Sequence, residues 1–185
     1  MRGRQVALLY LALGVLGAHY WLVERSAPNA PARAARPRFL GIDAAALREV
    51  RIMRAGRTIV ARRAREGWDV VEPAGAAIPP GLIAAFANAL LAAEEITRVA
   101  DAAVDREAFG LDERAVRVEL VPEAGPVVAV ALGEVNPTGT AVYAQRVGAP
   151  GVILIGRQAR YYEDMIFQAL PAGHVPAGGG APIGG

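Results

Sequence analysis

The sequence contains no cysteine and no lysine, and it has only two histidines and one serine among its 185 residues. Without cysteine the chain cannot form disulfides, thiolate metal sites, a thiol nucleophile or a bacterial lipoprotein anchor. The one serine, Ser26, has no Gly-x-Ser-x-Gly pattern around it, which excludes a serine hydrolase. His19 lies in an apolar run and His174 in a Gly/Pro-rich tail, so we expect neither to be catalytic or metal-binding.

The charged residues are mixed in sign along the whole chain. All 20 basic residues are arginines, they are scattered among 18 acidic residues, and the formal net charge is only +2. Nucleic-acid binding requires a concentrated basic face. We therefore expect no nucleic-acid partner.

Three carboxylate clusters are candidates for acid–base chemistry. They are Glu94 with Glu95, Asp101 with Asp105, and Glu163 with Asp164. Adjacent acids do not share one helix face, and Arg98, Arg106 and Arg160 are nearby ion-pair partners. The spacing of Asp101 and Asp105 does not supply the alternating oxygen ligands of a calcium loop. We therefore predict acids that are solvated at the surface or paired with these arginines, and no enzyme activity, no metal and no cofactor.

An uncharged apolar run extends over residues 6–23, VALLYLALGVLGAHYWLV. As a helix it would cross about 27 Å, nearly a full hydrocarbon core. The aromatic residues at its C-terminal end suit the membrane interface. We predict a transmembrane anchor represented by Val6, Leu9, Leu13, Leu16, Tyr20 and Trp21.

The charges that flank this anchor do not determine its orientation in the membrane. Arg2 and Arg4 precede the run, but Arg25 and further arginines follow it, so the positive-inside rule is nearly balanced. A short basic tail before an apolar run is the usual start of a signal or signal anchor. We expect residues 1–5 in the cytoplasm, residues 6–23 in a bacterial inner (cytoplasmic) membrane, and the C-terminal domain in the periplasm or outside the cell. Cleavage is the alternative, but no small-x-small site directly follows the run.

Composition divides the remaining chain into three parts. Residues 24–38 are rich in Pro, Ala and Arg without an apolar period and predict a linker. Residues 171–185 consist mostly of Pro, Gly and Ala, which cannot bury enough surface to fold, and predict a disordered tail. The folded domain is expected over residues 39–170.

Within the domain the apolar spacing predicts an α+β fold. Helical spacing occurs over residues 79–93 and 158–170. Alternation separated by turn residues predicts strands at 49–53, 58–62, 68–71, 115–121, 127–132, 141–147 and 152–155. We therefore expect antiparallel β-meanders, each followed by a helix, with both helices on one face of the sheet.

The two strand openings Val50-Arg51-Ile52 and Val116-Arg117-Val118 match in residue type. This match suggests two similar lobes produced by duplication, although short alternating segments often resemble each other. Most aromatic residues are expected in the core. Tyr161 and Tyr162 cannot share one helix face, so we predict this pair as the docking patch for a partner.

Several short motifs resemble a known family. They are Gly67-Trp68-Asp69-Val70 leading to Pro73, Phe109-Gly110-Leu111-Asp112, Leu132-Gly133-Glu134 and Val142-Tyr143-Ala144. Their order after an N-terminal apolar run resembles domain of unknown function 4340, a family of bacterial membrane-anchored proteins often found alongside gliding-type ABC transporters. The resemblance implies an ABC transporter as a partner and supplies no catalytic residue. We expect scaffold roles for Trp68, Gly110, Leu111, Gly133 and Tyr143.

The function we expect is that of a non-catalytic, membrane-anchored extracytoplasmic accessory or scaffold protein of an envelope complex. Its partners would be the lipid bilayer and other membrane or envelope proteins. The alternative is an extracytoplasmic module that binds a small molecule or glycan, which would require a concave pocket with convergent polar groups. An enzyme that uses carboxylates alone would require two acids facing each other in a cleft.

Overall fold

The computed structural model describes residues 5, 12–19, 21, 36–100 and 105–170. It divides into two compact units, Met1–Arg36 and Pro37–Gly185. The predicted tail, 171–185, and most of the predicted linker lie outside the described residues.

In the first unit, residues 12–19 are helical, and Leu13, Leu16 and Trp21 are exposed. Among the described residues, no helix combines the length and the apolar character needed to cross a membrane. Val6, Leu9 and Tyr20 lie outside the described residues. The transmembrane anchor therefore stays a prediction.

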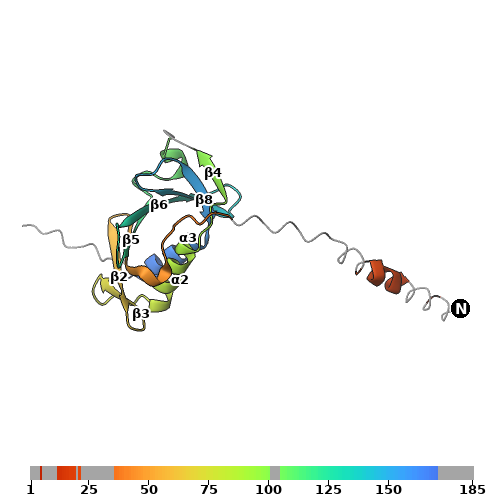
Figure 1. The fold of residues 1–185 in the computed structure, drawn as a ribbon, viewed down its shortest axis with the longest axis horizontal. Coiled ribbons are helices and arrows are strands. Elements are labelled where there is room, and N and C mark those ends of the chain that lie inside the picture. The colour runs from red at the N-terminus through yellow and green to blue at the C-terminus, as the bar shows by residue number, and fades with distance from the viewer. Residues whose placement is uncertain (1–4, 6–11, 20, 22–35, 101–104, 171–185) are drawn as a thin grey trace, which may run out of the picture. The chain divides into compact units, whose positions relative to one another are not determined.

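The second unit is an α+β domain with an antiparallel sheet, as the apolar spacing predicts (Figure 1). Over the described residues the sheet has eight strands, one more than predicted. The strand order is β3-β2-β1-β5-β6-β7-β8-β4. The elements in chain order are η1 (Ala44–Ala46), β1 (Leu47–Arg54), β2 (Arg57–Ala64), β3 (Gly67–Glu72), α2 (Pro80–Leu91), β4 (Thr97–Ala100), η2 (Glu107–Phe109), β5 (Val116–Pro122), β6 (Val128–Val135), β7 (Ala141–Arg146), β8 (Val152–Gly156) and α3 (Gln158–Gln168).

The antiparallel pair β1 and β5 joins the two meanders in the middle of the sheet. Outward from this pair, β2 and β3 follow on one side and β6, β7 and β8 on the other. Val50 lies opposite Leu120 and Ile52 opposite Val118, and all four side chains are buried. The meanders therefore share one continuous core.

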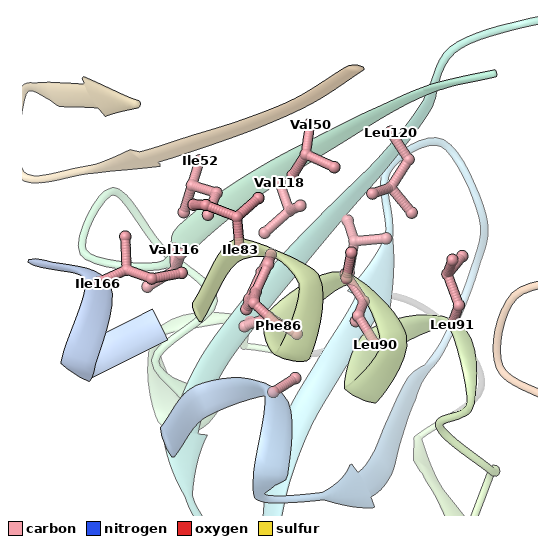
Figure 2. Close-up of a cluster of buried hydrophobic side chains, with 14 of the residues drawn as sticks. Val50, Ile52, Ile83, Phe86, Leu90, Leu91, Val116, Val118, Leu120 and Ile166 are labelled. Atoms are coloured by element: carbon pink, nitrogen blue, oxygen red, sulfur yellow. The ribbon is translucent and has the colours of Figure 1, made fainter. Parts of the chain in front are cut away.

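Helices α2 and α3 cover the inner face of the sheet. Ile83, Phe86 and Leu90 of α2 point toward the apolar side chains of β1 and β5 (Figure 2). Ile166 of α3 belongs to the same cluster. Because the buried side chains of both helices belong to one cluster with those of β1 and β5, both helices lie on the same face of the sheet.

The helix boundaries have local causes. Pro79 and Pro80 open α2, where proline suits the first turn because its missing N–H has no helical acceptor there. The apolar run of α2 then continues to Leu91 without a charged residue. Trp68, on β3, is buried in the same core, and the Arg63 guanidinium lies 5.3 Å from its ring centroid.

A second, smaller apolar cluster lies apart from the main core and includes side chains of β6, β7 and β8. It contains Leu111, Ala115, Ala131 and Val152, with Phe109 and Tyr143 packed against them. The Phe109 and Tyr143 rings meet edge to face, with centroids 4.8 Å apart. Gly110 ends the η2 turn with a left-handed φ of 63°, as its position after the turn predicts.

Gly110 and Gly133 allow the η2 segment to lie directly against β6. A Cβ atom on Gly133 would overlap the carbonyl oxygen of Phe109, and one on Gly110 would lie 2.9 Å from the backbone nitrogen of Glu134. Four of the five scaffold residues predicted from the family motifs, Gly110, Leu111, Gly133 and Tyr143, are therefore brought together by this segment.

Besides shifts of one or two residues at the ends of other elements, the predicted boundaries differ from the structure in three places. Strand β4 was not predicted. Strand β6 continues to Val135, so Gly133 belongs to a strand and not to the connecting loop. Pro37 and Arg38 already belong to the folded unit. The Pro37 carbonyl accepts a hydrogen bond from the backbone N–H of Glu95, and the backbone of Arg38 forms an isolated antiparallel β-bridge with Glu94.

We predict that Gly133→Ala destabilises the domain by about 3 kcal/mol, because the added methyl group meets a backbone oxygen that cannot rotate away. Urea denaturation of the full chain in detergent micelles, followed by tryptophan fluorescence, measures this loss.

Gly156→Ala is the matched control, because a Cβ atom there meets nothing within 4 Å. Equal stability of the two variants would contradict the close packing of η2 on β6.

Candidate functional site

The candidate site begins at the tip of the β1–β2 hairpin. Ala55 and Gly56 form the two-residue turn, and both have positive φ, 47° and 74°, as a type I′ turn requires. Arg54 and Arg57 flank the turn and lie directly opposite each other on the ladder. Like charges in this position repel, so something nearby must stabilise them.

Two carboxylates of α3 stabilise Arg54. Its Nη1 atom donates to Glu163 Oε1 at 3.0 Å and to Asp164 Oδ1 at 2.7 Å. The Glu163 side chain is 0% exposed, whereas Asp164 is partly exposed. These ion pairs connect the hairpin tip to the last helix.

Glu163 is held in an unfavourable environment for its charge. Burial raises the pKa of Glu163, and the positive charges of Arg160 and Arg54 oppose this shift only in part. Its Oε2 atom lies 3.3 Å from Arg160 Nη1 but accepts no hydrogen bond. Glu163 therefore binds a proton more readily than a glutamate in water does.

The second buried carboxylate, Glu49 on β1, shows the opposite behaviour. It accepts from Arg62 Nε at 2.6 Å and from Arg51 Nε at 2.7 Å. The hydrogen bond from Arg62 is the largest cause that lowers the pKa of Glu49, and burial opposes it. Glu49 is thus a fully paired structural anion, whereas Glu163 is not.

Arg57 is less completely paired than Arg54. Its guanidinium carbon lies 5.7 Å from the ring centroid of Phe167, and that of Arg54 lies 5.6 Å from the same ring. The buried Arg57 Nη2 atom has no hydrogen-bond acceptor among the described residues. Arg57 also takes part in none of the ion pairs that the described residues form.

These groups line an open cleft of about 270 Å³ between the hairpin tip and α3. Its lining consists of Arg54, Ala55, Arg57, Asp164, Phe167 and Gln168. The cleft combines two guanidinium groups, one carboxylate and one aromatic ring. Such a lining can bind a small anion.

A second groove, of about 560 Å³, lies between the segment that precedes η1 and the end of α2. Arg38, Asp43, Asn88 and Leu91 are among its lining residues. None of the lining residues of this groove has a buried side-chain nitrogen or oxygen atom that lacks a hydrogen-bond partner among the described residues.

The predicted docking pair lies on α3. Tyr161 is 56% exposed, and Tyr162 packs against the main core. Their rings meet edge to face with centroids 5.5 Å apart. The docking role of this pair stays a prediction.

The predicted acidic clusters have different surroundings. Glu94 is exposed, and its backbone forms the isolated β-bridge with Arg38. Asp101 lies outside the described residues. Glu163 is buried, so it is not a solvated surface acid, but it forms the predicted ion pair with Arg160, at 3.3 Å. No group of three or more His, Cys, Asp or Glu in the described part of the chain could hold a metal ion.

Sequence reasoning missed the pairing of Arg54 and Arg57 with α3. Arg54 and Glu163 are 109 residues apart, so spacing along the chain gives no sign of their contact. One signal was present: Glu163 occupies the same helix stripe as Ala159 and Ile166, where only apolar residues are expected.

We predict that Glu163→Gln changes how stability depends on pH. In the wild-type protein, folded Glu163 keeps a proton above the ordinary pKa of 4.5 that the unfolded chain releases, so the free energy of unfolding falls as pH rises through this window. The glutamine of the variant has no charge to bury, so the variant should lack this fall and gain stability relative to wild type as pH rises from 4.5 to 7. Urea denaturation across this range measures the difference.

Glu66→Gln, at an exposed position, reports the general effect of losing one negative charge. A difference between wild type and the Glu163→Gln variant that does not change with pH would contradict the raised pKa.

Comparison of the chain with protein-family models, with curated proteins and with solved structures finds no match. The resemblance to domain of unknown function 4340 therefore stays a prediction, and the function is argued from the chain's own residues.

Proposed function

We propose that this chain is a non-catalytic accessory or scaffold protein, anchored in a bacterial inner membrane, whose α+β domain binds other envelope proteins. The observation that carries the proposal is the uncharged apolar run over residues 6–23, followed by a compact α+β unit. A chain of this kind is tethered by one end and presents its domain to partners at the membrane.

The surroundings of the buried acids support a role without catalysis. A catalytic carboxylate pair requires two acids facing each other in a cleft. The two buried glutamates are instead on different elements, β1 and α3, and each faces arginines. These carboxylates hold strands and helices together.

The exposed side chains of α3 support a role in protein binding. Tyr161 is the one aromatic residue that is largely exposed among the described residues 36–100 and 105–170. Tyrosine is enriched at the centres of protein interfaces because its ring gives contact area and its hydroxyl gives a hydrogen bond. Tyr161 lies three residues from Asp164, which lines the cleft at the hairpin tip.

Location and partner follow from the same proposal. The short basic tail before the apolar run favours a domain in the periplasm or outside the cell. The motif resemblance favours an ABC transporter as the partner complex.

A binding module for a small molecule or glycan is the second candidate. The groove beside η1, at about 560 Å³, falls within the volume range of small-molecule sites and presents Arg38, Asp43 and Asn88. An extracted protein that carries a bound metabolite and no protein partner would favour this function.

We also propose that the two meanders arose by duplication. If Val50 is aligned with Val116, then Ile52 is equivalent to Val118, and these two residues pair directly across the central ladder. Equivalent residues that face each other are expected on a local two-fold axis between repeats. The repeats differ in that β8 precedes α3, whereas β4 follows α2.

We predict that the full-length protein remains in carbonate-washed membranes and is extracted in mild detergent together with a stoichiometric protein partner. Leu13→Arg combined with Leu16→Arg should release the protein from the membrane, since each charge near the middle of the run costs about 3 kcal/mol.

Leu13→Ile combined with Leu16→Ile is the control and should leave the protein in the membrane fraction. Uncut wild-type protein in the soluble fraction would refute the anchor. Extraction of the protein alone would refute the scaffold function.

A further inference from the structure

We propose that the cleft between the β1–β2 hairpin and α3 receives an acidic side chain of the partner protein, with Arg57 as the residue that binds its carboxylate. This inference rests on the proposed function and names the chemistry by which the partner is recognised.

The two arginines of the cleft differ in how completely they are paired. Arg54 is neutralised by Asp164 and by Glu163, to which it donates at 2.7 and 3.0 Å. Arg57 forms no ion pair among the described residues, and its buried Nη2 atom has no acceptor there. Because Arg57 lines the cleft, a carboxylate that enters it would supply the charge partner that this guanidinium lacks in the described part of the chain.

The position of Arg57 is fixed before any ligand arrives. The β-ladder sets its backbone opposite Arg54, and its guanidinium lies 5.7 Å from the centroid of Phe167. Phe167 is buried and belongs to the main core. A guanidinium held against a rigid ring loses little conformational freedom on binding, which favours recognition.

The turn of the β1–β2 hairpin also contains features that lower the stability of the fold. Ala55 has a φ of 47°, a left-handed conformation that is less favourable for alanine than for glycine. The turn also brings two arginines directly opposite each other. Strain and like-charge repulsion at one tip are typical of sites kept for binding.

Net charge favours a carboxylate over a phosphate. Three guanidinium groups, those of Arg54, Arg57 and Arg160, face two carboxylates at this tip, Glu163 and Asp164, which leaves one positive charge in excess when both carboxylates are ionised. A carboxylate supplies one negative charge and matches the planar guanidinium with two parallel hydrogen bonds. A phosphate dianion would exceed the available positive charge and would face the Asp164 carboxylate.

Size and access favour a side chain over a whole metabolite. The cleft, at about 270 Å³, is smaller than most small-molecule sites, which begin at about 300 Å³. Ala55 and Gln168 on its lining are exposed, so it opens at the protein surface. A single acidic side chain on a docking surface fits such an opening.

The experiment is a nuclear magnetic resonance titration of the full-length protein in detergent micelles, in which the side-chain Nε–Hε signals of arginine are observed. The probe is the blocked peptide Gly-Gly-Glu-Gly-Gly, and the matched probe is Gly-Gly-Gln-Gly-Gly. The Arg57 signal, assigned by its loss in Arg57→Gln, should shift with the glutamate peptide and not with the glutamine peptide.

Variants locate the effect. Arg57→Gln should weaken binding of the glutamate peptide at least tenfold, and Arg57→Lys should retain part of it, because lysine keeps the charge but not the two parallel donors. Arg65→Gln removes an exposed arginine that does not line the cleft and should leave binding unchanged. Removing Arg57 also relieves the repulsion with Arg54, so the variant should fold, which circular dichroism checks.

Three outcomes overturn the proposal: equal binding of the two peptides, unchanged binding by Arg57→Gln, or tighter binding of inorganic phosphate or acetate than of the glutamate peptide. A co-purified partner that still binds the Arg57→Gln protein would overturn the cleft assignment and leave the scaffold function standing. If the glutamate peptide binds at Arg57 but no partner co-purifies, the assignment of the cleft stands and the scaffold function is refuted.

Discussion

The pairing of β1 with β5 is the constraint on which the rest of the domain depends. Val50, Ile52, Val118 and Leu120 meet across this ladder, and each is at most 1% exposed. Because the four side chains point to the same face, they create the surface on which α2 packs and to which α3 is joined. Without this ladder neither meander could bury its helix fully.

The ion pairs at the hairpin tip extend this arrangement to the surface. Arg54 is the last residue of β1, and its two acidic partners belong to α3, the last helix of the domain. The burial of Glu163 costs more than its arginines return, as the direction of its pKa shift indicates. The hairpin tip and α3 are therefore joined through the Glu163 carboxylate, whose burial is not fully offset by its arginines. A ligand that binds beside such a carboxylate can change its environment strongly.

Local patterns predicted most of the strands and both helices of the domain. Alternation identified β1, β2 and β5, and the spacing of Leu82, Phe86 and Leu90 identified α2, because these elements bury one face against the core. Strand β4 was missed because it is a short edge strand that pairs with β8 alone, and Val99 within it is exposed. A strand without a buried face leaves little trace in the sequence.

The candidate site was harder to predict than the fold. Glu163 was expected to be solvated or paired with Arg160, because its neighbour Asp164 cannot share its helix face and Arg160 precedes it by about one turn. Its burial results from contact with Arg54, and the role of Arg57 results from contact with Phe167, both of which depend on how α3 docks on the hairpin. Contacts of this kind are set by tertiary packing, which periodicity does not encode.

The placement of β4 has a consequence for synthesis. This strand is made with the first meander, yet its partner in the sheet is β8, which belongs to the end of the second. During translation the free edge of β1 and the whole of β4 must wait until β5 and β8 leave the ribosome. The nascent first half thus exposes strand edges with unpaired backbone N–H and C=O groups for the time needed to synthesise the second, and a chaperone that covers such edges would be most useful in that interval.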